Sequence, residues 1–203
     1  MEYQLFGKKI KKDIKMHYIK IILIGEPSVG KSSILIRYMY NIFYPQYHET
    51  KGLDYAMKIV NLTNPKPIKI YLWDLAGRSE YQTMIRTYYH NTNVAIIVYD
   101  ITNAESFKCV PQWIDKVKDI LPDVKIVLVA NKQDLKEKRQ VSLAENEAMV
   151  KKYKLQFIEC SASTGYNIKN IFTQIYNEAD YSKLPYTDDN DKLYNQRDCH
   201  ICW

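Results

Sequence analysis

The sequence predicts an α/β fold: a mostly parallel sheet of six strands, one of them antiparallel, with helices on both faces. Three observations support this class. Short apolar runs rich in β-branched residues alternate with stretches of helical periodicity. Two such runs flank Asn-Pro-Lys-Pro at residues 64–67, which predicts a hairpin. The first run leads through a glycine-containing turn into a helix, and ligands of such folds bind at the carboxyl ends of the strands.

The chain divides into a basic extension at residues 1–15, one domain at 16–181 and a flexible tail at 182–203. With 203 residues and 46% hydrophobic content, the chain can bury one substantial core. No apolar run approaches the roughly 20 residues of a membrane span, and the first residues are too charged for a signal peptide. We therefore expect a cytoplasmic protein.

The formal net charge of +6 is unevenly placed, because the first 15 residues hold five lysines against Glu2 and Asp13. No arginine-rich face with interleaved aromatic residues accompanies this extension, so we expect no nucleic acid partner. A solvated arm and an arm that contacts an acidic membrane surface both remain open.

The first strand is expected at residues 17–25, where a nearly continuous apolar run is typical of a strand buried on both faces. A helix follows from Lys31 to about Ile42. The hairpin supplies the next two strands, and three later apolar runs supply the rest. These five strands are expected at residues 53–62, 67–75, 93–101, 124–131 and 155–161.

Three more helices are expected among and after these strands, at residues 104–121, 141–154 and 168–181. Ser142 and Glu145 form a capping-box pattern at the start of the second of them. Asn167 stands at the expected N-cap of the last one.

Residues 24–33 read IGEPSVGKSS and contain Gly-x-x-x-x-Gly-Lys-Ser where the first strand meets the first helix. In that context the backbone N–H groups of the loop and the helix N-terminus hold phosphate. Lys31 reaches the outer phosphates, and the Ser32 hydroxyl binds magnesium. The predicted nucleotide-binding residues of this loop are Gly25, Glu26, Pro27, Ser28, Val29, Gly30, Lys31, Ser32 and Ser33.

Asn131-Lys132-Gln133-Asp134 ends a later strand and predicts that the base is guanine. A carboxylate at Asp134 accepts two hydrogen bonds from the N1–H and N2–H₂ edge of guanine, a pair of donors that adenine lacks. Lys132 is expected along the base and ribose, and the Asn131 amide is expected to tie this loop to the phosphate loop. The turn expected to place a backbone N–H near guanine O6 comprises Ser161, Ala162 and Ser163.

These motifs resemble those of the Ras-like small GTPase superfamily, and the chain is most similar to the Rab family over roughly residues 16–181. Further Rab-like stretches are TKGLDY at 50–55, WDLAG at 73–77, the Tyr88-Tyr89 pair and VYDITNAESF at 98–107. The resemblance implies the P-loop small GTPase fold, with GTP or GDP and Mg²⁺ as ligands. It also implies a molecular switch that hydrolyses GTP and acts in vesicle and membrane trafficking.

The resemblance implies roles for individual residues. Thr50 joins Ser32 on magnesium when GTP is bound, and Asp74 holds a magnesium water. The Gly77 N–H senses the γ-phosphate, and Phe43 covers the guanine edge. Tyr55, Trp73 and Tyr88 match the aromatic triad that shows the nucleotide state to effectors, while simple core packing of these rings remains the alternative.

The resemblance also implies partners. They are an exchange factor, a GTPase-activating protein, a GDP dissociation inhibitor or escort protein, and effectors that bind switch I, around Thr50, and switch II, around Gly77. A C-terminal lipid would hold the protein on the cytosolic face of endomembranes. Cys199 and Cys202 are the lipidation candidates, although their spacing departs from the usual prenylation patterns. A free or metal-binding Cys-x-x-Cys and an unmodified tail remain open.

The chain departs from the family pattern at residues that matter for hydrolysis. Arg78 stands where the family places the glutamine that orients the attacking water, and Pro27 lies in the phosphate loop near the γ-phosphate. Lys51 makes the effector face more basic than usual. The residues assigned to the hydrolysis step are Lys31, Thr50, Gly77 and Arg78.

We therefore expect weak intrinsic GTP hydrolysis, with Glu80 or an activating protein as possible sources of rescue. A hydrolysis-deficient, mostly GTP-bound binding module is the alternative function. A phosphotransferase that acts on a small metabolite is a third hypothesis, and the guanine motif argues against it.

Overall fold

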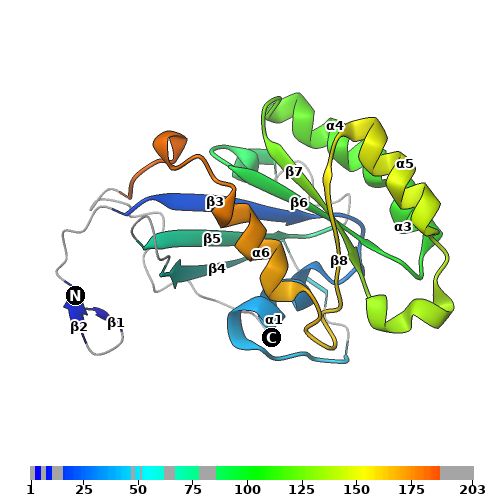
Figure 1. Ribbon diagram of the computed structural model, residues 1–203, viewed down its shortest axis with the longest axis horizontal. Helices are drawn as coiled ribbons and strands as arrows, with labels where there is room; N and C mark the ends of the chain where they lie inside the picture. Colours follow the sequence, from blue (N-terminus) through cyan, green and yellow to red (C-terminus); the bar gives the residue numbers. More distant parts are fainter. Residues whose placement is uncertain are drawn as a thin grey trace.

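The computed structural model describes a six-stranded sheet with the order β4-β5-β3-β6-β7-β8 (Figure 1). The sheet is parallel throughout except for β4, which pairs antiparallel with β5. This is the predicted α/β class, including its one antiparallel strand. The residues described are 3–5, 8–10, 16–46, 49–50, 52–61, 67–77 and 86–187. The six strands are β3 (Tyr18–Ile24), β4 (Leu53–Val60), β5 (Ile68–Leu75), β6 (Val94–Asp100), β7 (Lys125–Asn131) and β8 (Gln156–Glu159).

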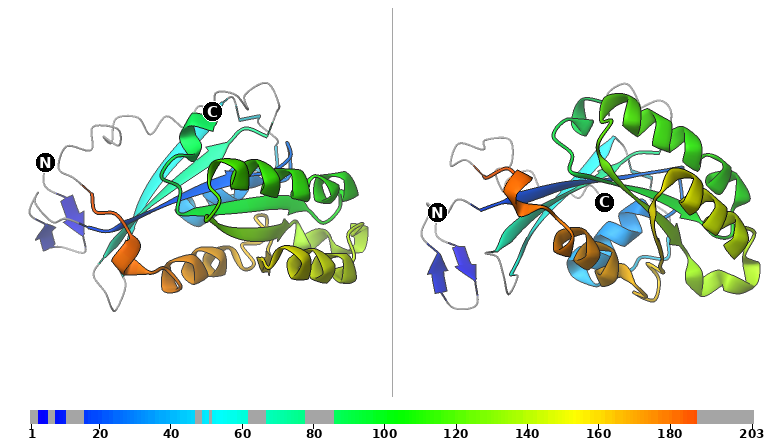
Figure 2. Two further views of the ribbon diagram at one scale, coloured as in Figure 1. Left: turned by 90° about the horizontal axis from the view of Figure 1, so that it is seen from above. Right: turned by 45° about the horizontal axis from the view of Figure 1, so that its top comes forward.

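Helices cover both faces of the sheet, and Figure 2 shows α1 and α6 together on one side and α4 on the other. The α-helices are α1 (Lys31–Tyr40), α3 (Ala104–Lys108), α4 (Val110–Ile120), α5 (Leu143–Tyr153) and α6 (Ile168–Asn177). Short 3₁₀ turns are η2 (Arg86–Tyr89), η3 (Gln133–Lys138) and η4 (Tyr181–Lys183). None of the helices described is long and apolar enough to cross a membrane.

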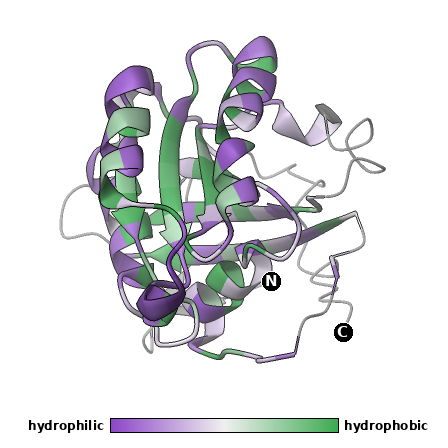
Figure 3. Cartoon of the chain, turned by 90° about the vertical axis from the view of Figure 1, so that its right-hand side faces the viewer, coloured by the Kyte–Doolittle hydropathy of each residue, from purple (hydrophilic) through white to green (hydrophobic). Residues whose placement is uncertain are grey.

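The sheet divides the apolar interior into two cores because alternate residues of each strand face opposite sides. Ile21 of β3 belongs to the core beneath α1 and α6, whereas its neighbour Ile22 belongs to the core beneath α4. Figure 3 shows the hydrophobic residues gathered on the strands and on the helix surfaces that face them. A strand buried on both faces reads as a continuous apolar run, which is why periodicity located β3 and β6.

The helix predicted at residues 104–121 is in fact two helices, α3 and α4, with the break at Cys109. Pro111 explains the break, because its nitrogen has no hydrogen with which to continue the helical ladder to the carbonyl of Phe107. Proline is tolerated in the first turn of a new helix, and it occupies that position in α4.

Two predicted caps had different outcomes. The capping box of Ser142 and Glu145 is present at α5, with hydrogen bonds in both directions. The prediction that Asn167 caps α6 is right for the position and wrong for the mechanism. Its side chain donates from Nδ2 to the Glu159 carbonyl at 2.9 Å and makes no capping bond. The helix also ends at Asn177, earlier than predicted, and a separate turn follows it.

The ends of the described domain meet beside the start of β3. The Thr187 N–H donates to the Met16 carbonyl at 2.9 Å, and the Tyr18 N–H donates to the Pro185 carbonyl at 3.0 Å. The rings of His17 and Tyr186 lie 3.9 Å apart. The boundary predicted at residue 181 therefore falls six residues short of the last described contact. In the predicted N-terminal extension, β1 (Tyr3–Leu5) and β2 (Lys8–Ile10) form a small antiparallel sheet that sequence reasoning did not predict.

Lys20 of β3 is a buried lysine, with 5% of its surface exposed. Its Nζ donates to the His90 carbonyl at 2.8 Å and lies 5.0 Å from the centroid of the Trp73 ring. Burial lowers its pKa from 10.5 to about 8. The position therefore favours loss of the proton at a pH where an exposed lysine keeps it.

We predict that Lys20 raises the free energy of unfolding as the pH increases from about 8 toward 10. In that window the unfolded chain still binds the proton that the folded chain has released, so the slope with pH is positive. Urea unfolding at a series of pH values should show this contribution in the wild type and in Lys108→Met, an exposed control, but not in Lys20→Met. Parallel curves for all three proteins would contradict the assignment.

Candidate functional site

The turn between β3 and α1 has a backbone that only glycine fits at two positions. Gly25 and Gly30 have φ angles of 135° and 96°, in the region that disfavours side chains. A Cβ on Gly25 would collide with the Val98 carbonyl, and one on Gly30 would collide with the side chain of Asn131. Gly30 is also the N-cap of α1 and offers no side chain to cap its first N–H groups, which favour an anion.

Lys31 lies beneath this loop, with its side chain buried. Its Nζ donates to the carbonyls of Gly25 at 3.0 Å and Glu26 at 2.9 Å. Burial lowers the pKa of Lys31, while the charges of Asp74 and Glu26 act in the opposite direction. The ammonium is thus held inside the curve of the loop, where an outer phosphate would meet it.

Three oxygen groups from separate segments converge next to Lys31. The Ser32 hydroxyl lies 2.8 Å from the Thr50 hydroxyl and 2.5 Å from Asp74 Oδ2, and Thr50 donates to the same carboxylate oxygen at 3.2 Å. Asp74 is completely buried, and burial raises its pKa to about 6 against the opposing effects of Lys31 and Ser32. Its other oxygen, Oδ1, has no hydrogen-bond partner among the described residues. One carboxylate and two hydroxyls are hard oxygen donors, which fits Mg²⁺.

Gly77 follows β5 and lies directly against the phosphate loop. A Cβ on Gly77 would lie 2.6 Å from the Gly25 oxygen and 2.7 Å from the Pro27 nitrogen, so a side chain would force the two segments apart. Switch II therefore begins in contact with the phosphate loop. Lys51, Arg78 and Glu80, to which the sequence assigns further roles, lie outside the described residues.

The guanine motif at the end of β7 is joined to both neighbouring segments. As predicted, the Asn131 amide ties it to the phosphate loop, with Nδ2 donating to the Val29 carbonyl at 2.9 Å. The Ala162 N–H donates to Asn131 Oδ1 at 3.1 Å. Asp134 Oδ1 accepts from the Ser161 hydroxyl at 2.5 Å. The carboxylate expected to bind the N1–H and N2–H₂ edge of guanine therefore lies beside the turn expected to bind O6.

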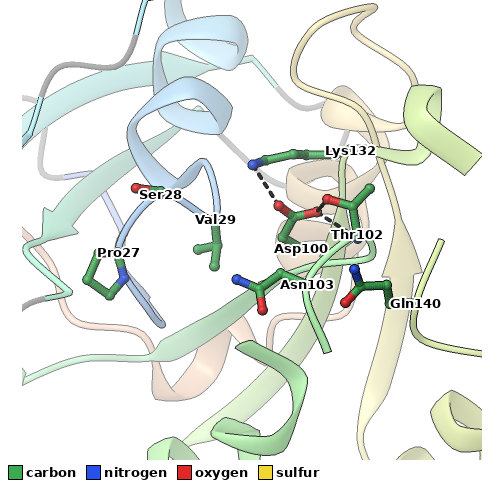
Figure 4. Close-up of a pocket in the computed structure, with 8 residues that line it drawn as sticks. All are labelled: Pro27, Ser28, Val29, Asp100, Thr102, Asn103, Lys132 and Gln140. Atoms are coloured by element: carbon green, nitrogen blue, oxygen red, sulfur yellow. Dashed lines mark hydrogen bonds and ion pairs between the residues drawn. The ribbon is translucent and has the colours of Figure 1, made fainter. Parts of the chain in front are cut away.

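A polar cavity of about 410 Å³ lies between the phosphate loop and the loops after β6 and β7. Figure 4 shows Lys132 reaching across it toward Ser28, with its Nζ 2.6 Å from Asp100 Oδ2. Asp100 in turn accepts from the N–H and the hydroxyl of Thr102. The cavity is lined by Pro27, Ser28, Val29, Asp100, Thr102, Asn103, Lys132 and Gln140.

The side chains of two residues predicted to bind nucleotide, Glu26 and Phe43, have partners within the protein. The Glu26 carboxylate faces α4, where its Oε1 accepts from the Trp113 indole N–H at 2.9 Å, so only the backbone of Glu26 serves the loop. The Phe43 ring packs against the core beneath α1 and α6, with the Arg37 guanidinium 6.0 Å from its centroid. A glutamate carboxylate that pointed into a phosphate loop would repel phosphate. The hydrogen bond from the Trp113 indole holds the Glu26 carboxylate toward α4 instead.

The aromatic residues predicted to face effectors form a contiguous group. The Trp73 ring lies 5.0 Å from the Tyr55 ring and 5.3 Å from the Tyr88 ring. All three residues are partly exposed, so they contact one another and also present a surface.

Sequence reasoning missed three residues that shape the site: Asp100, Trp113 and Arg37. Asp100 had a signal, because it ends β6 at the same sheet edge as the phosphate loop and the guanine motif. The apolar face of α4 gave no hint that the indole N–H of Trp113 is used. Arg37 reads as an ordinary basic residue in the last turn of α1.

The model of the Ras family matches residues 20–181, from the first strand of the domain to beyond α6. The chain belongs to the Ras family. The match includes the phosphate loop, the oxygen cluster, the guanine motif and the turn at residues 161–163. As a Ras-family small GTPase, the chain binds GTP and GDP together with Mg²⁺. The oxygen donors around Asp74 suit that ion.

We predict that Asp134→Asn weakens GDP and GTP binding by roughly a hundredfold or more, because two hydrogen bonds to a charged acceptor are lost. The same variant should gain affinity for xanthosine diphosphate, whose C2 carbonyl accepts from the new amide. Nucleotide competition at equilibrium measures both effects. Glu137→Gln is the matched control, since it neutralises an exposed carboxylate on the same turn. Unchanged GDP affinity in Asp134→Asn would contradict the role of Asp134.

Proposed function

We propose that this GTPase is a Rab-like switch that acts in vesicle and membrane trafficking. The observation that carries the proposal is the convergence of the hydroxyls of Ser32 and Thr50 on Asp74. Thr50 comes from the segment between α1 and β4, whereas Ser32 and Asp74 belong to the phosphate loop and β5. A bound Mg²⁺ and γ-phosphate would hold that segment in place, and their loss would release it.

The Rab assignment is supported by the sequence stretches named above and by the contact among Tyr55, Trp73 and Tyr88. These rings belong to β4, β5 and η2, next to the two switches. A change in either switch therefore alters the surface that the three rings share. On this proposal, effectors bind that surface, and an exchange factor and an activating protein act on the switches.

We propose that intrinsic hydrolysis is slow because of Arg78. The family's glutamine accepts a hydrogen bond from the attacking water and donates one to the γ-phosphate. A guanidinium has five donors and no acceptor, so it steadies negative charge but does not orient the water. Pro27 acts in the same direction, because it removes one backbone donor from a loop that lies against Gly77.

The alternative is a module that hydrolyses almost no GTP and stays bound to it. Single-turnover hydrolysis separates the two functions. A working switch should convert its bound GTP to GDP slowly but completely, whereas the module should keep its GTP. A Rab-type activating protein that supplies its own arginine and glutamine would restore turnover in the first case only.

The first test is single-turnover GTP hydrolysis by the wild type and Arg78→Gln. We expect the variant to hydrolyse GTP about ten to a hundred times faster than the wild type, which should be slower than the roughly 10⁻⁴ to 10⁻³ s⁻¹ of Ras-like proteins. Arg78→Ala is the control, because it removes the guanidinium without adding an acceptor and should stay slow. An Arg78→Gln rate no higher than wild type would refute this account of the loop.

We further propose that Cys199 and Cys202 carry prenyl groups that hold the protein on endomembranes, with a GDP dissociation inhibitor or escort protein as carrier. The tail at residues 182–203 has a net charge of −1 and cannot serve as a polybasic second signal. Stable attachment takes two signals, so it needs both cysteines or one cysteine and the basic extension. Both cysteines lie outside the described residues.

Mass spectrometry of the protein from its native cell is the test of this anchor. We expect a prenyl mass on at least one of the two cysteines and recovery of the protein with membranes. A doubly substituted Cys199→Ser, Cys202→Ser protein should lose the mass and move to the soluble fraction. An unmodified C-terminal peptide would refute the anchor.

A further inference from the structure

The guanidinium of Arg37 contacts two segments to which the sequence analysis assigns guanine binding or which adjoin such residues: the turn at residues 161–163 and the stretch from Asn41 to Phe43. Its Nε donates to the Ala162 carbonyl at 2.8 Å, and one terminal nitrogen donates to the Ser163 carbonyl at 2.6 Å. The other terminal nitrogen donates to the Asn41 carbonyl at 2.9 Å, just past the end of α1. The same group lies 6.0 Å from the centroid of the Phe43 ring.

These contacts fix the turn at residues 161–163 from its outer side. Consecutive carbonyls held by one planar, charged group leave the intervening peptide little freedom to rotate. The orientation of that peptide decides where the N–H groups of the turn point. On the inner side, the Ala162 N–H reaches Asn131 Oδ1 at 3.1 Å, so the turn is held from both sides.

Arg37 also lies on the helix that opens with Lys31 and Ser32. One rigid element therefore carries the phosphate contacts at its start and the clamp on the base-reading turn near its end. We propose that Arg37 is a positioning residue for guanine recognition, which holds the 161–163 turn so that a backbone N–H of the turn reads O6. This inference rests on the proposed role of the turn in binding guanine.

The experiment uses GDP and 6-thio-GDP, which differ only in the atom at position 6. Sulfur is a weaker hydrogen-bond acceptor than oxygen, so the ratio of the two affinities reports how well the turn reads this atom. We expect the wild type to prefer GDP. In Arg37→Gln, GDP should dissociate roughly ten times faster than from the wild type. The ratio of the affinity for GDP to that for 6-thio-GDP should fall toward one.

Two further variants separate positioning from stability. Arg37→Lys keeps one charged donor but cannot hold both carbonyls in the same geometry, so its affinity ratio should lie between those of the wild type and Arg37→Gln. Phe172→Leu is the control, because Phe172 of α6 stacks on Tyr38, which lies on α1 next to Arg37. The two ring centroids are 3.8 Å apart. This variant should lower the melting temperature and leave the affinity ratio unchanged.

The outcomes distinguish this inference from the proposed function. Weak GDP binding by the wild type would overturn both. Tight GDP binding with an unchanged oxygen-to-sulfur ratio in Arg37→Gln would overturn the role of Arg37 alone, even if the melting temperature fell. A wild type that does not distinguish the two nucleotides would show that the turn does not read O6, and would likewise overturn the inference.

Discussion

The loops that follow β3, β7 and β8 are joined through one buried amide, that of Asn131, which is 2% exposed. Its nitrogen holds the Val29 carbonyl, and its oxygen accepts from the Ala162 N–H and, at 3.6 Å, from the Cys160 thiol. A buried amide must satisfy both of its ends, and here each end is satisfied by a different loop. The phosphate loop and the base-reading turn are thereby fixed relative to each other, although 102 and 31 residues of chain separate their atoms from Asn131.

Around this link the site combines burial with charge. Asp74 and Lys31 are both removed from water, which disfavours the charged form of each, and each also stabilises the charge of the other. The two groups meet at the carboxyl edge of the sheet, where the loops after the parallel strands carry most of the polar groups of the site. Gly25 and Gly77 let these loops approach more closely than any side chain would allow.

The sequence predicted the class of fold, the strand positions and the edge at which the site forms, because each depends on local signals: apolar runs, a hairpin turn and a phosphate-loop pattern. It failed where a residue has two physically acceptable partners. No local sequence pattern indicates that the Glu26 carboxylate accepts from Trp113. Nor does any pattern indicate that the Asn167 side chain donates to the Glu159 carbonyl instead of capping its own helix. Arg37 was missed for a related reason, since its partners are backbone carbonyls 125 and 126 residues away, and carbonyls carry no sequence signature.

The pairing of Met16 with Thr187 places the two ends of the described domain on the side opposite the nucleotide site. These residues meet at the amino end of β3, whereas the phosphate loop begins at its carboxyl end, seven residues of strand or about 23 Å away. An attachment to the chain beyond Thr187 would therefore act at the end of the domain that lies opposite the phosphate loop. The lipid anchor proposed above would therefore be joined to the domain at the end of β3 that lies away from the phosphate loop, and the nucleotide site would be separate from the point of attachment.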